Sequence, residues 1–298
     1  MPLSVSIVVP VLNGAAIIRD LLTALVNQRG CPHGFEIIVV DNGSVDRTQE
    51  IVRQFEVTLL EESRRGPGPA RNRGLYHASG EIIAHLDADT IPTRRWLAEI
   101  TTPFSNPEVV LVAGHSIPYK PATPAQHFIA QRGSLIADLV TRETIPFAPS
   151  LNMAVRRQAA LDIGGWTEDM LTAEDIDFSY RLLKVYPSNI IFNPLAVVYH
   201  QARNTDQDLR TQAWTYGEGL AQFKYKHPES FQFGVRERLR LYILLIERGF
   251  SPGLTRLNML IGRAGEKELS FMKYLRKWSF WYWGGFFSYL KHQQRREP

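Results

Sequence analysis

The sequence is poor in cysteine and in long apolar runs. Cys31 is its single cysteine among 298 residues, which excludes a disulfide within the chain and is typical of a reducing compartment. No uninterrupted apolar stretch reaches the ~20 residues that a membrane-spanning helix needs. The first ten residues lack the length and the basic flank of a signal peptide. We therefore expect a cytoplasmic protein without a transmembrane helix.

The sequence also lacks internal repeats and low-complexity segments. Its composition, 44% hydrophobic and 21% charged, is that of a globular protein. The net charge of +4 is unevenly distributed, because residues 1–202 carry 17 basic and 21 acidic side chains, whereas residues 203–298 carry 17 basic and 9 acidic ones. The basic carboxy-terminal third favours an anionic partner, which is a membrane surface, a nucleic acid or a phosphorylated substrate.

Strand-like and helix-like patterns alternate over the first 90 residues. The expected strands are residues 5–10, 35–40, 57–60 and 82–86, and the expected helices between them are residues 15–28, 49–55 and 70–78. This alternation predicts an α/β fold with a mostly parallel sheet and helices on both faces. Ligands of such sheets bind outside the carboxyl ends of the strands.

Polar residues follow three of these strands. Asn13 lies beyond the first strand, Asp41 beyond the second, and Asp87 and Asp89 beyond the fourth. Because the carboxyl ends of parallel strands share one edge of the sheet, we expect these side chains to converge there. Paired carboxylates at such an edge can hold a divalent cation and the phosphates bound to it. The alternative is that Asp87 and Asp89 serve as an N-cap and a turn residue before a helix near Thr93.

The pattern is less regular beyond residue 105. Residues 109–117 and 190–199 are typical of strands, and residues 125–140 and 172–183 are typical of helices. Two consecutive glycines precede Trp166 and predict a tight turn. From Asp206 onward the sequence is largely helical.

Five motifs, taken in chain order, resemble the family 2 glycosyltransferases. They are residues 6–13 (SIVVPVLN), 40–48 (VDNGSVDRT), 70–74 (ARNRG), 87–89 (DAD) and 174–177 (EDID). The resemblance covers about residues 4–200. It implies a GT-A, Rossmann-like catalytic domain over residues 1–205, followed by a helical carboxy-terminal region over residues 206–298. It also implies inverting, metal-dependent transfer of a sugar from a nucleotide-diphosphate sugar, with UDP favoured, to a hydroxyl acceptor.

The resemblance implies that Asp87, Ala88 and Asp89 form the D-x-D motif that binds the donor and its metal. Asp89 would bind the cation directly, and Asp87 would contact the cation or the ribose side of the donor. Mg²⁺ and Mn²⁺ prefer oxygen ligands of this kind and commonly share them with substrate phosphates. Many relatives place a histidine such as His200 near the metal or the diphosphate. The alternative for His200 is a structural histidine bonded to the backbone.

Further donor contacts are implied around the first two strands. Asp41 resembles the aspartate that contacts the nucleobase, where it can accept a hydrogen bond from a ring N–H of uracil or thymine. Its alternative role is an Asx turn or a helix cap. Pro10, Val11 and Asn13 would line the same pocket, mostly through backbone atoms. Arg71 would reach the nucleotide with its guanidinium, which suits phosphate, and the second arginine of that motif is its rival.

Asp175 is the candidate general base. An inverting transfer needs one carboxylate to take the proton of the acceptor hydroxyl while its oxygen attacks the anomeric carbon. In the family the second residue of the Glu-Asp pair has this role, and here it is Asp175. The alternative is a set of acids favoured by the dipole at a helix N-terminus, which fits Glu174 and Asp177.

The carboxy-terminal region is rich in aromatic residues. Residues 271–290 contain ten aromatic side chains, with basic residues at both ends. Trp and Tyr favour the headgroup region of a bilayer and basic residues favour anionic lipid, so we expect peripheral contact with the cytoplasmic face of a membrane. Packing on the catalytic domain and a dimer interface are the alternatives. Nucleic-acid binding is disfavoured because no nucleic-acid-binding motif is present.

These observations favour a glycosyltransferase of the hexosyltransferase type that acts in polysaccharide or glycolipid biosynthesis. A lipid-linked or polysaccharide acceptor would suit an enzyme attached to a membrane. A nucleotidyltransferase is disfavoured because no Gly-rich phosphate loop with a lysine follows the first strand. A nucleotide-sugar-binding protein without activity is the remaining alternative, and the presence of Asp87, Asp89 and Asp175 disfavours it.

Overall fold

The computed structural model describes residues 4–31, 34–133, 146–187, 190–201, 204–230 and 265–294, with three two-residue helical pieces between residues 252 and 259. The chain divides into two compact units. The first unit comprises Met1–Tyr119 and Ser134–Gln201, and the second comprises Lys120–Gly133 and Ala202–Pro298. The domain boundary at residue 205 stays a prediction.

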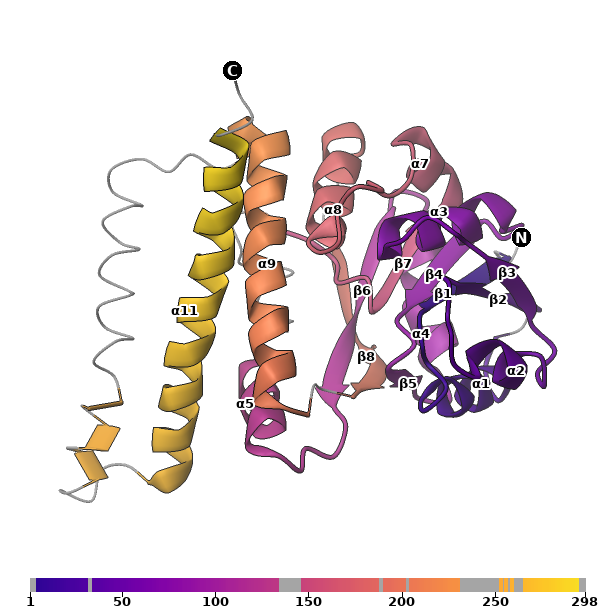
Figure 1. The fold of residues 1–298 in the computed structure, drawn as a ribbon. Coiled ribbons are helices and arrows are strands. Elements are labelled where there is room, and N and C mark those ends of the chain that lie inside the picture. The colour runs from indigo at the N-terminus through magenta and orange to yellow at the C-terminus, as the bar shows by residue number, and fades with distance from the viewer. Residues whose placement is uncertain are drawn as a thin grey trace. The chain divides into compact units, whose positions relative to one another are not determined.

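The first unit is built on one eight-stranded sheet (Figure 1). Its strands are β1 (Val5–Val11), β2 (Phe35–Asp41), β3 (Thr58–Glu61), β4 (Ile82–Leu86), β5 (Thr90–Pro92), β6 (Leu111–Pro118), β7 (Asn152–Arg156) and β8 (Ile191–His200). Their order across the sheet is β3-β2-β1-β4-β7-β6-β8-β5. Strands β3, β2, β1 and β4 are parallel, β7 is antiparallel to both β4 and β6, β6 is parallel to β8, and β5 is antiparallel to β8. The predicted mostly parallel α/β sheet is confirmed.

Successive residues of the central strands face two different apolar cores. Ile7 and Val9 of β1 belong to one core, and Val8 belongs to the other. This alternation is what period-2 side-chain geometry requires of a strand covered on both faces. The first core is closed by α1 (Ile18–Val26), α2 (Thr48–Val52) and α4 (Trp96–Thr101), which continues into the 3₁₀ helix η1 (Thr102–Ser105), and the second by α3 (Pro67–His77), α7 (Arg157–Asp162) and α8 (Glu174–Val185).

Strand β7 and the start of helix α3 are among the features of this unit that differ from the sequence-based expectation. Strand β7 was not predicted, because its apolar run of three residues is too short to be distinctive; its pairing with β4 and β6 holds it in the sheet. Helix α3 begins at Pro67, three residues earlier than expected. A proline suits the first helical turn because the N–H that it lacks would have no partner in the helix.

The second unit is helical. It contains α5 (Pro124–Gly133), α9 (Asp206–Lys226), the 3₁₀ turn η2 (Pro228–Ser230) and α11 (Glu266–Gln294). The remainder of the helix expected over residues 125–140 lies outside the described residues. Phe128 of α5 packs on Trp278 of α11 and lies in one core with Leu209 of α9. The backbones of α9 and α11 are in close contact at Gly217, where an added Cβ would clash with the carbonyl oxygen of Tyr282.

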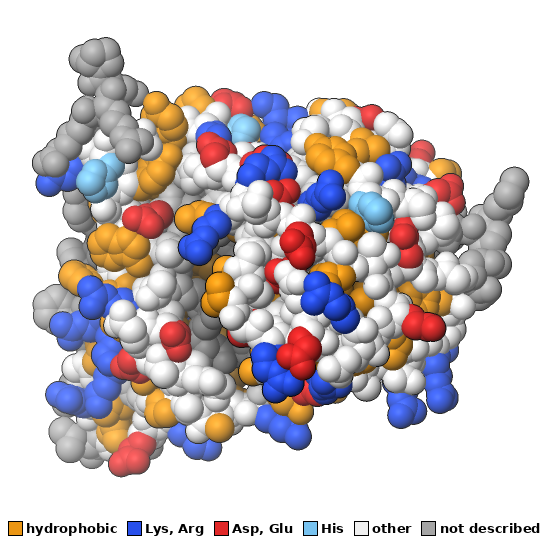
Figure 2. Space-filling model, turned by 45° about the vertical axis from the view of Figure 1, so that its right-hand side comes forward, with side chains coloured by type: hydrophobic (Ala, Val, Ile, Leu, Met, Phe, Trp, Pro, Cys, Tyr) orange, Lys and Arg blue, Asp and Glu red, His pale blue; other side chains and the backbone are white. Residues whose placement is uncertain are grey.

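The aromatic residues of α11 are divided between core and surface. Trp278 and Phe286 are buried, whereas Phe280 is 74% exposed and Phe287 is 51% exposed. In the part of the chain that the structure describes, no helix has both the length and the apolar character needed to cross a membrane. On the face drawn in Figure 2, acidic and basic side chains are interspersed rather than separated into patches of one sign.

Candidate functional site

The Asp87-Ala88-Asp89 motif forms the turn between β4 and β5. The backbone N–H of Thr90 donates to the carbonyl oxygen of Asp87 at 3.1 Å, and its hydroxyl donates to the same oxygen at 2.7 Å. The carbonyl oxygen of Asp89 accepts from the N–H of Gln201 at 2.9 Å. All three motif residues are half-buried. The turn therefore has a fixed backbone and presents its two carboxylates at the carboxyl end of β4.

His200 lies beside Asp89 because β8 pairs with β5, in the register that sets Thr90 opposite His200. The Nε2 atom of His200 is 3.4 Å from Oδ2 of Asp89. Within the described ranges, no group of three or more His, Cys, Asp or Glu side chains is placed to hold a metal by itself. One carboxylate and one imidazole nonetheless suit a cation that takes its other ligands from a bound diphosphate.

Arg71 is the buried centre of the site. It projects from α3 with 3% of its side chain exposed. One terminal nitrogen donates to Oε1 of Glu174 at 2.7 Å, and the other donates to Oδ1 of Asp87 at 2.7 Å and to the hydroxyl of Ser150 at 2.8 Å. Its guanidinium carbon lies 4.9 Å from the ring centre of Trp166. A single side chain thus joins the D-x-D turn to the start of α8.

Helix α8 begins with Glu174 and Asp175, the acidic pair that was predicted to contain the catalytic base. Its N-cap residue, Ala173, has a φ of 61°, a left-handed conformation that is unusual for a residue with a side chain. Asp175 is half-buried, with Oδ1 accepting from the N–H of Ile176 at 2.9 Å and Oδ2 accepting from the N–H of Ser150 at 3.4 Å. Ser150 therefore contacts both Arg71 and Asp175.

The ionisation of Asp175 is perturbed strongly. Burial, and after it the charge of Glu174, raise the pKa of Asp175 to about 7, against the opposing effect of Arg71. Burial also raises the pKa of Glu174, with Arg71 the main opposing influence. A general base is most effective when its pKa lies near the working pH. Asp175 is therefore suited to accept a proton near neutral pH.

Asp177, also in the first turn of α8, has a structural role. Its Oδ2 accepts from Nε of Arg181 at 2.8 Å and from the hydroxyl of Thr167 at 2.5 Å. The guanidinium of Arg181 also donates to the carbonyl oxygens of Ile163 and Gly165. Asp177 and Arg181 thus hold residues 163–167 against the first turn of α8, a structural role that the sequence did not predict.

The carboxyl ends of β1 and β2 are tied together. Val11 pairs with Asp41, and the N–H of Asn13 donates to the hydroxyl of Ser44 at 2.8 Å. The buried carboxylate of Asp41 accepts from the N–H of Ser44 at 3.2 Å and from Nε2 of Gln49 at 2.8 Å. Pro10 lies one residue before the end of β1. The Asx-type contact of Asp41 is present, and its contact with a nucleobase stays a prediction.

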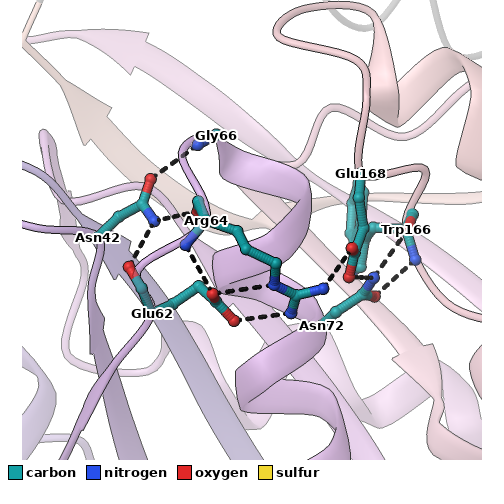
Figure 3. A network of polar contacts seen from close by, with 7 residues as sticks. All are labelled: Asn42, Glu62, Arg64, Gly66, Asn72, Trp166 and Glu168. Atoms are coloured by element: carbon teal, nitrogen blue, oxygen red, sulfur yellow. Dashed lines mark hydrogen bonds and ion pairs between the residues drawn. The ribbon is translucent and has the colours of Figure 1, made fainter.

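A second polar network braces α3 against the loop that precedes α8 (Figure 3). Arg64 pairs with the buried carboxylate of Glu62 at 2.8 Å and with Glu168 at 2.5 Å. The side chain of Asn72 accepts from the N–H of Trp166 at 2.7 Å and donates to the carbonyl oxygen of the same residue at 2.9 Å. The network holds residues 166–168 beside α3, next to Arg71.

Trp166 lies in the core of the first unit. It is 2% exposed, stacks on Phe178 with ring centres 4.3 Å apart, and meets the ring of His85 edge-on at 5.1 Å. Neither ring nitrogen of His85 has a hydrogen-bond partner among the described residues. Burial, and after it the charge of Arg71, keep the pKa of His85 well below its usual value, so this imidazole is neutral.

The family described as Glycosyl transferase family 2 matches residues 6–164, more than half of the chain. The chain belongs to this family. Over 237 residues this family 2 member is 31% identical to the pre-mycofactocin glycosyltransferase of Mycobacterium tuberculosis (strain ATCC 25618 / H37Rv), an alignment that covers 76% of this chain and 48% of the relative. It is also 31% identical over 185 residues to glycosyltransferase AglE of Haloferax volcanii, covering 59% and 60% of the two chains. This family 2 member spans about half the length of the curated relatives it matches.

Solved structures of glycosyltransferases share the fold of this chain. A mannosyltransferase of Pyrobaculum calidifontis in complex with GDP-Man and Mn²⁺ aligns with a TM-score of 0.63 at 20% identity, over 100% of this chain and 77% of that chain. Glucosyl-3-phosphoglycerate synthase of Mycobacterium tuberculosis, in complex with Mn²⁺, UDP and glucosyl-3-phosphoglycerate, aligns with a TM-score of 0.56 at 20% identity, over 75% and 79%. The predicted GT-A fold of this family 2 member is confirmed.

Sequence reasoning missed several contacts of the site. Ser150 had no predicted role, although it contacts both Arg71 and Asp175. The pairing of Arg64 with Glu62 and Glu168 was also not predicted. A serine in a loop carries no distinctive signal, and an ion pair between residues about 100 positions apart leaves none in one sequence.

Proposed function

We propose that this family 2 member transfers a sugar from a nucleotide-diphosphate sugar, UDP favoured, to a hydroxyl acceptor with inversion at the anomeric carbon. Asp175 is the general base in this proposal, and Asp87 and Asp89 hold the donor end. The observation that carries the proposal is the position of Arg71, which contacts Asp87 on one side and Glu174, the neighbour of Asp175, on the other. The donor-binding motif and the base therefore belong to one cluster.

The cluster supplies what an inverting transfer needs. The acceptor oxygen attacks the anomeric carbon while Asp175 takes its proton, and the bond from that carbon to the diphosphate oxygen breaks with its electron pair leaving on the nucleotide. Attack and departure occur on opposite faces of the sugar, so the base and the diphosphate must lie on opposite sides of it. With a pKa of about 7, Asp175 is deprotonated in a large fraction of molecules at neutral pH.

A divalent cation fits the donor end of this cluster. The carboxylate of Asp89 and the imidazole of His200, 3.4 Å apart, would hold Mn²⁺ or Mg²⁺ together with the donor phosphates, and Asp87 would support them. The bound cation would offset negative charge on the departing diphosphate. Mn²⁺ is present in two of the structural relatives, one with GDP-Man and one with UDP, which supports the proposal without choosing the nucleotide.

The proposed activity is tested by incubating the full chain and Mn²⁺ with UDP-glucose, UDP-N-acetylglucosamine, UDP-galactose or GDP-mannose, each labelled in the sugar, and a lipid extract. Label should move to the extract with one donor, and the product should have the opposite anomeric configuration. Asp175→Asn should abolish transfer and retain binding of the nucleotide. Nucleotide binding without transfer from any donor would favour the alternative of a nucleotide-sugar-binding protein without activity. Retention of the anomeric configuration would refute the inverting mechanism.

We also propose that α11 contacts an anionic membrane surface. Five exposed residues fall on one narrow stripe of this helix, because their spacings of three, four and seven residues return to the same side. They are Lys273, Arg276, Phe280, Phe287 and Lys291. Exposed phenylalanines between basic residues suit a bilayer interface with anionic headgroups. Such contact would also suit a lipid-linked acceptor.

The membrane contact is tested by sedimenting the protein with phosphatidylcholine vesicles, with and without phosphatidylglycerol. Binding should require the anionic lipid and should be lost in a Phe280→Ser/Phe287→Ser double variant. Tyr225→Ser, at an exposed aromatic residue of α9, is the matched control and should bind as the parent does. Equal sedimentation of the parent and the double variant, or no binding by the parent, would refute this proposal.

A further inference from the structure

Arg71 is held in a way that does not fit a simple ligand of the nucleotide phosphates. Both hydrogens of one terminal nitrogen are used, by Asp87 and by Ser150, and the other terminal nitrogen donates to Glu174. Its side chain is 3% exposed. To reach a phosphate, the guanidinium would have to leave partners that are themselves buried or half-buried, which is costly for charged groups.

The geometry points instead to Arg71 as a positioning residue for the proposed transfer: one guanidinium fixes the donor-side carboxylate Asp87 and the base-side pair Glu174–Asp175 in relation to each other. This inference rests on the proposed function. Through Oδ1, Arg71 anchors Asp87, and the described residues make no hydrogen bond to Oδ2 of Asp87, which leaves that oxygen for the donor end. Through Ser150 and Glu174, it anchors the start of α8.

The charges around Asp175 give this arrangement a measurable consequence. Glu174 adds a negative charge from the same helix, and Arg71 adds a positive charge from α3. Asp87, in the turn after β4, acts on Glu174, and His85 of β4 is neutral. Removing Arg71 should therefore raise the proton affinity of Asp175, and removing the charge of Glu174 should lower it. If Arg71 and Glu174 had a purely structural role, the two substitutions would not shift the proton affinity of Asp175 in opposite directions.

The first experiment measures the titration of Asp175 without any substrate. Urea unfolding is followed from about pH 5 to about pH 9 for the parent, Glu174→Gln and Arg71→Met, each with and without Asp175→Asn. In each background, the difference between the two stability curves reports the ionisation of Asp175 in the folded state. Its midpoint should lie near pH 7 in the parent, lower in Glu174→Gln and higher in Arg71→Met.

Two further variants keep this test decisive. If Arg71→Met fails to fold, Arg71→Lys replaces it. Lysine keeps the positive charge but lacks the planar fork that donates to three acceptors. In Arg71→Lys the midpoint of Asp175 ionisation should stay near that of the parent, while the affinity for UDP falls. Arg73→Met removes an exposed charge from the same helix and should leave the midpoint unchanged. Equal midpoints in the parent and in Glu174→Gln would overturn the inference.

The second experiment distinguishes positioning from direct contact with the donor. UDP with Mn²⁺ is titrated calorimetrically into the parent, Arg71→Lys, Asp87→Ala and the double variant. If Arg71 acts through Asp87, the arginine substitution should weaken binding several-fold in the parent and should have little further effect in the Asp87→Ala background. Losses that multiply would show direct contact of Arg71 with the nucleotide and would overturn the inference, while leaving the proposed transfer standing. Absence of UDP binding by the parent would contradict the proposed UDP donor instead.

Discussion

Replacing the proposed base should stabilise the folded protein at alkaline pH. Folding raises the pKa of Asp175 from an ordinary value of 3.8 to about 7. Each pKa unit corresponds to about 1.4 kcal/mol, so ionised Asp175 opposes folding by up to roughly 4 kcal/mol, and by about 2 kcal/mol if water screens this half-buried group. Because the folded state holds the proton more tightly, this cost is absent below about pH 4 and fully present above about pH 7.

Asp175→Asn removes that cost, since an amide does not ionise. We expect the free energy of unfolding of the variant to exceed that of the parent by about 2–4 kcal/mol at about pH 8.5, and by only about 1 kcal/mol at about pH 4.5. Urea unfolding at the two pH values, followed by the fluorescence of the buried Trp96 and Trp166 in the first unit, provides the measurement. A variant that is less stable than the parent at alkaline pH, or a pH-independent difference, would refute the assignment of Asp175 as a destabilised, high-pKa carboxylate.

Three other outcomes follow from the structure. Transfer should rise with pH through about 7 as Asp175 loses its proton, and a pH profile that is flat from about pH 5.5 to about pH 8.5 would contradict its role as base. Arg64→Ala should destabilise the protein by about 1–2 kcal/mol near pH 7, because it removes the ion pair of the buried Glu62. Arg64 lowers the pKa of Glu62, so this loss should shrink as the pH falls below the ordinary pKa of a glutamate, and urea unfolding at two pH values checks it. Gly217→Ala should cost about 1–3 kcal/mol in urea unfolding of the second unit, since its Cβ would meet the backbone of α11, whereas Gly265→Ala, with open space at its Cβ, should cost little.

Much of the first unit could be predicted from the sequence because its central strands, β1 and β4, are buried almost throughout. Four apolar runs separated by helical segments allow few arrangements other than a parallel sheet, and β1, β2, β3 and β4 lie where the pattern indicated. Strand β7 could not be predicted in this way. It is short, and its place between β4 and β6 depends on pairing with residues far away in sequence. Propensity within one segment does not report such pairing.

The residues of the candidate site that could be predicted from the sequence lie at the ends of strands. Parallel strands end at a common edge of the sheet, which predicts that Asp41, Asp87 and Asp89 lie there. In the structure Asp41 is the last residue of β2, and Asp87 and Asp89 follow β4. The ion pairs of Arg71 could not be read from the sequence, because they join α3 to residues 16 and 103 positions away. From the sequence alone, an arginine at this position is equally well explained as a phosphate ligand. Only its burial and its partners indicate a positioning role.

The most direct test of the central claim is a calorimetric titration of the full chain with UDP and with GDP, each with and without Mn²⁺. We expect one nucleotide to bind with Mn²⁺ and to bind much more weakly without it. Asp89→Ala should abolish the metal-dependent part, and Asp175→Asn should leave it unchanged. Absence of binding by a folded parent protein, or binding that ignores both Mn²⁺ and Asp89, would contradict the proposal that this family 2 member uses a metal-bound sugar nucleotide.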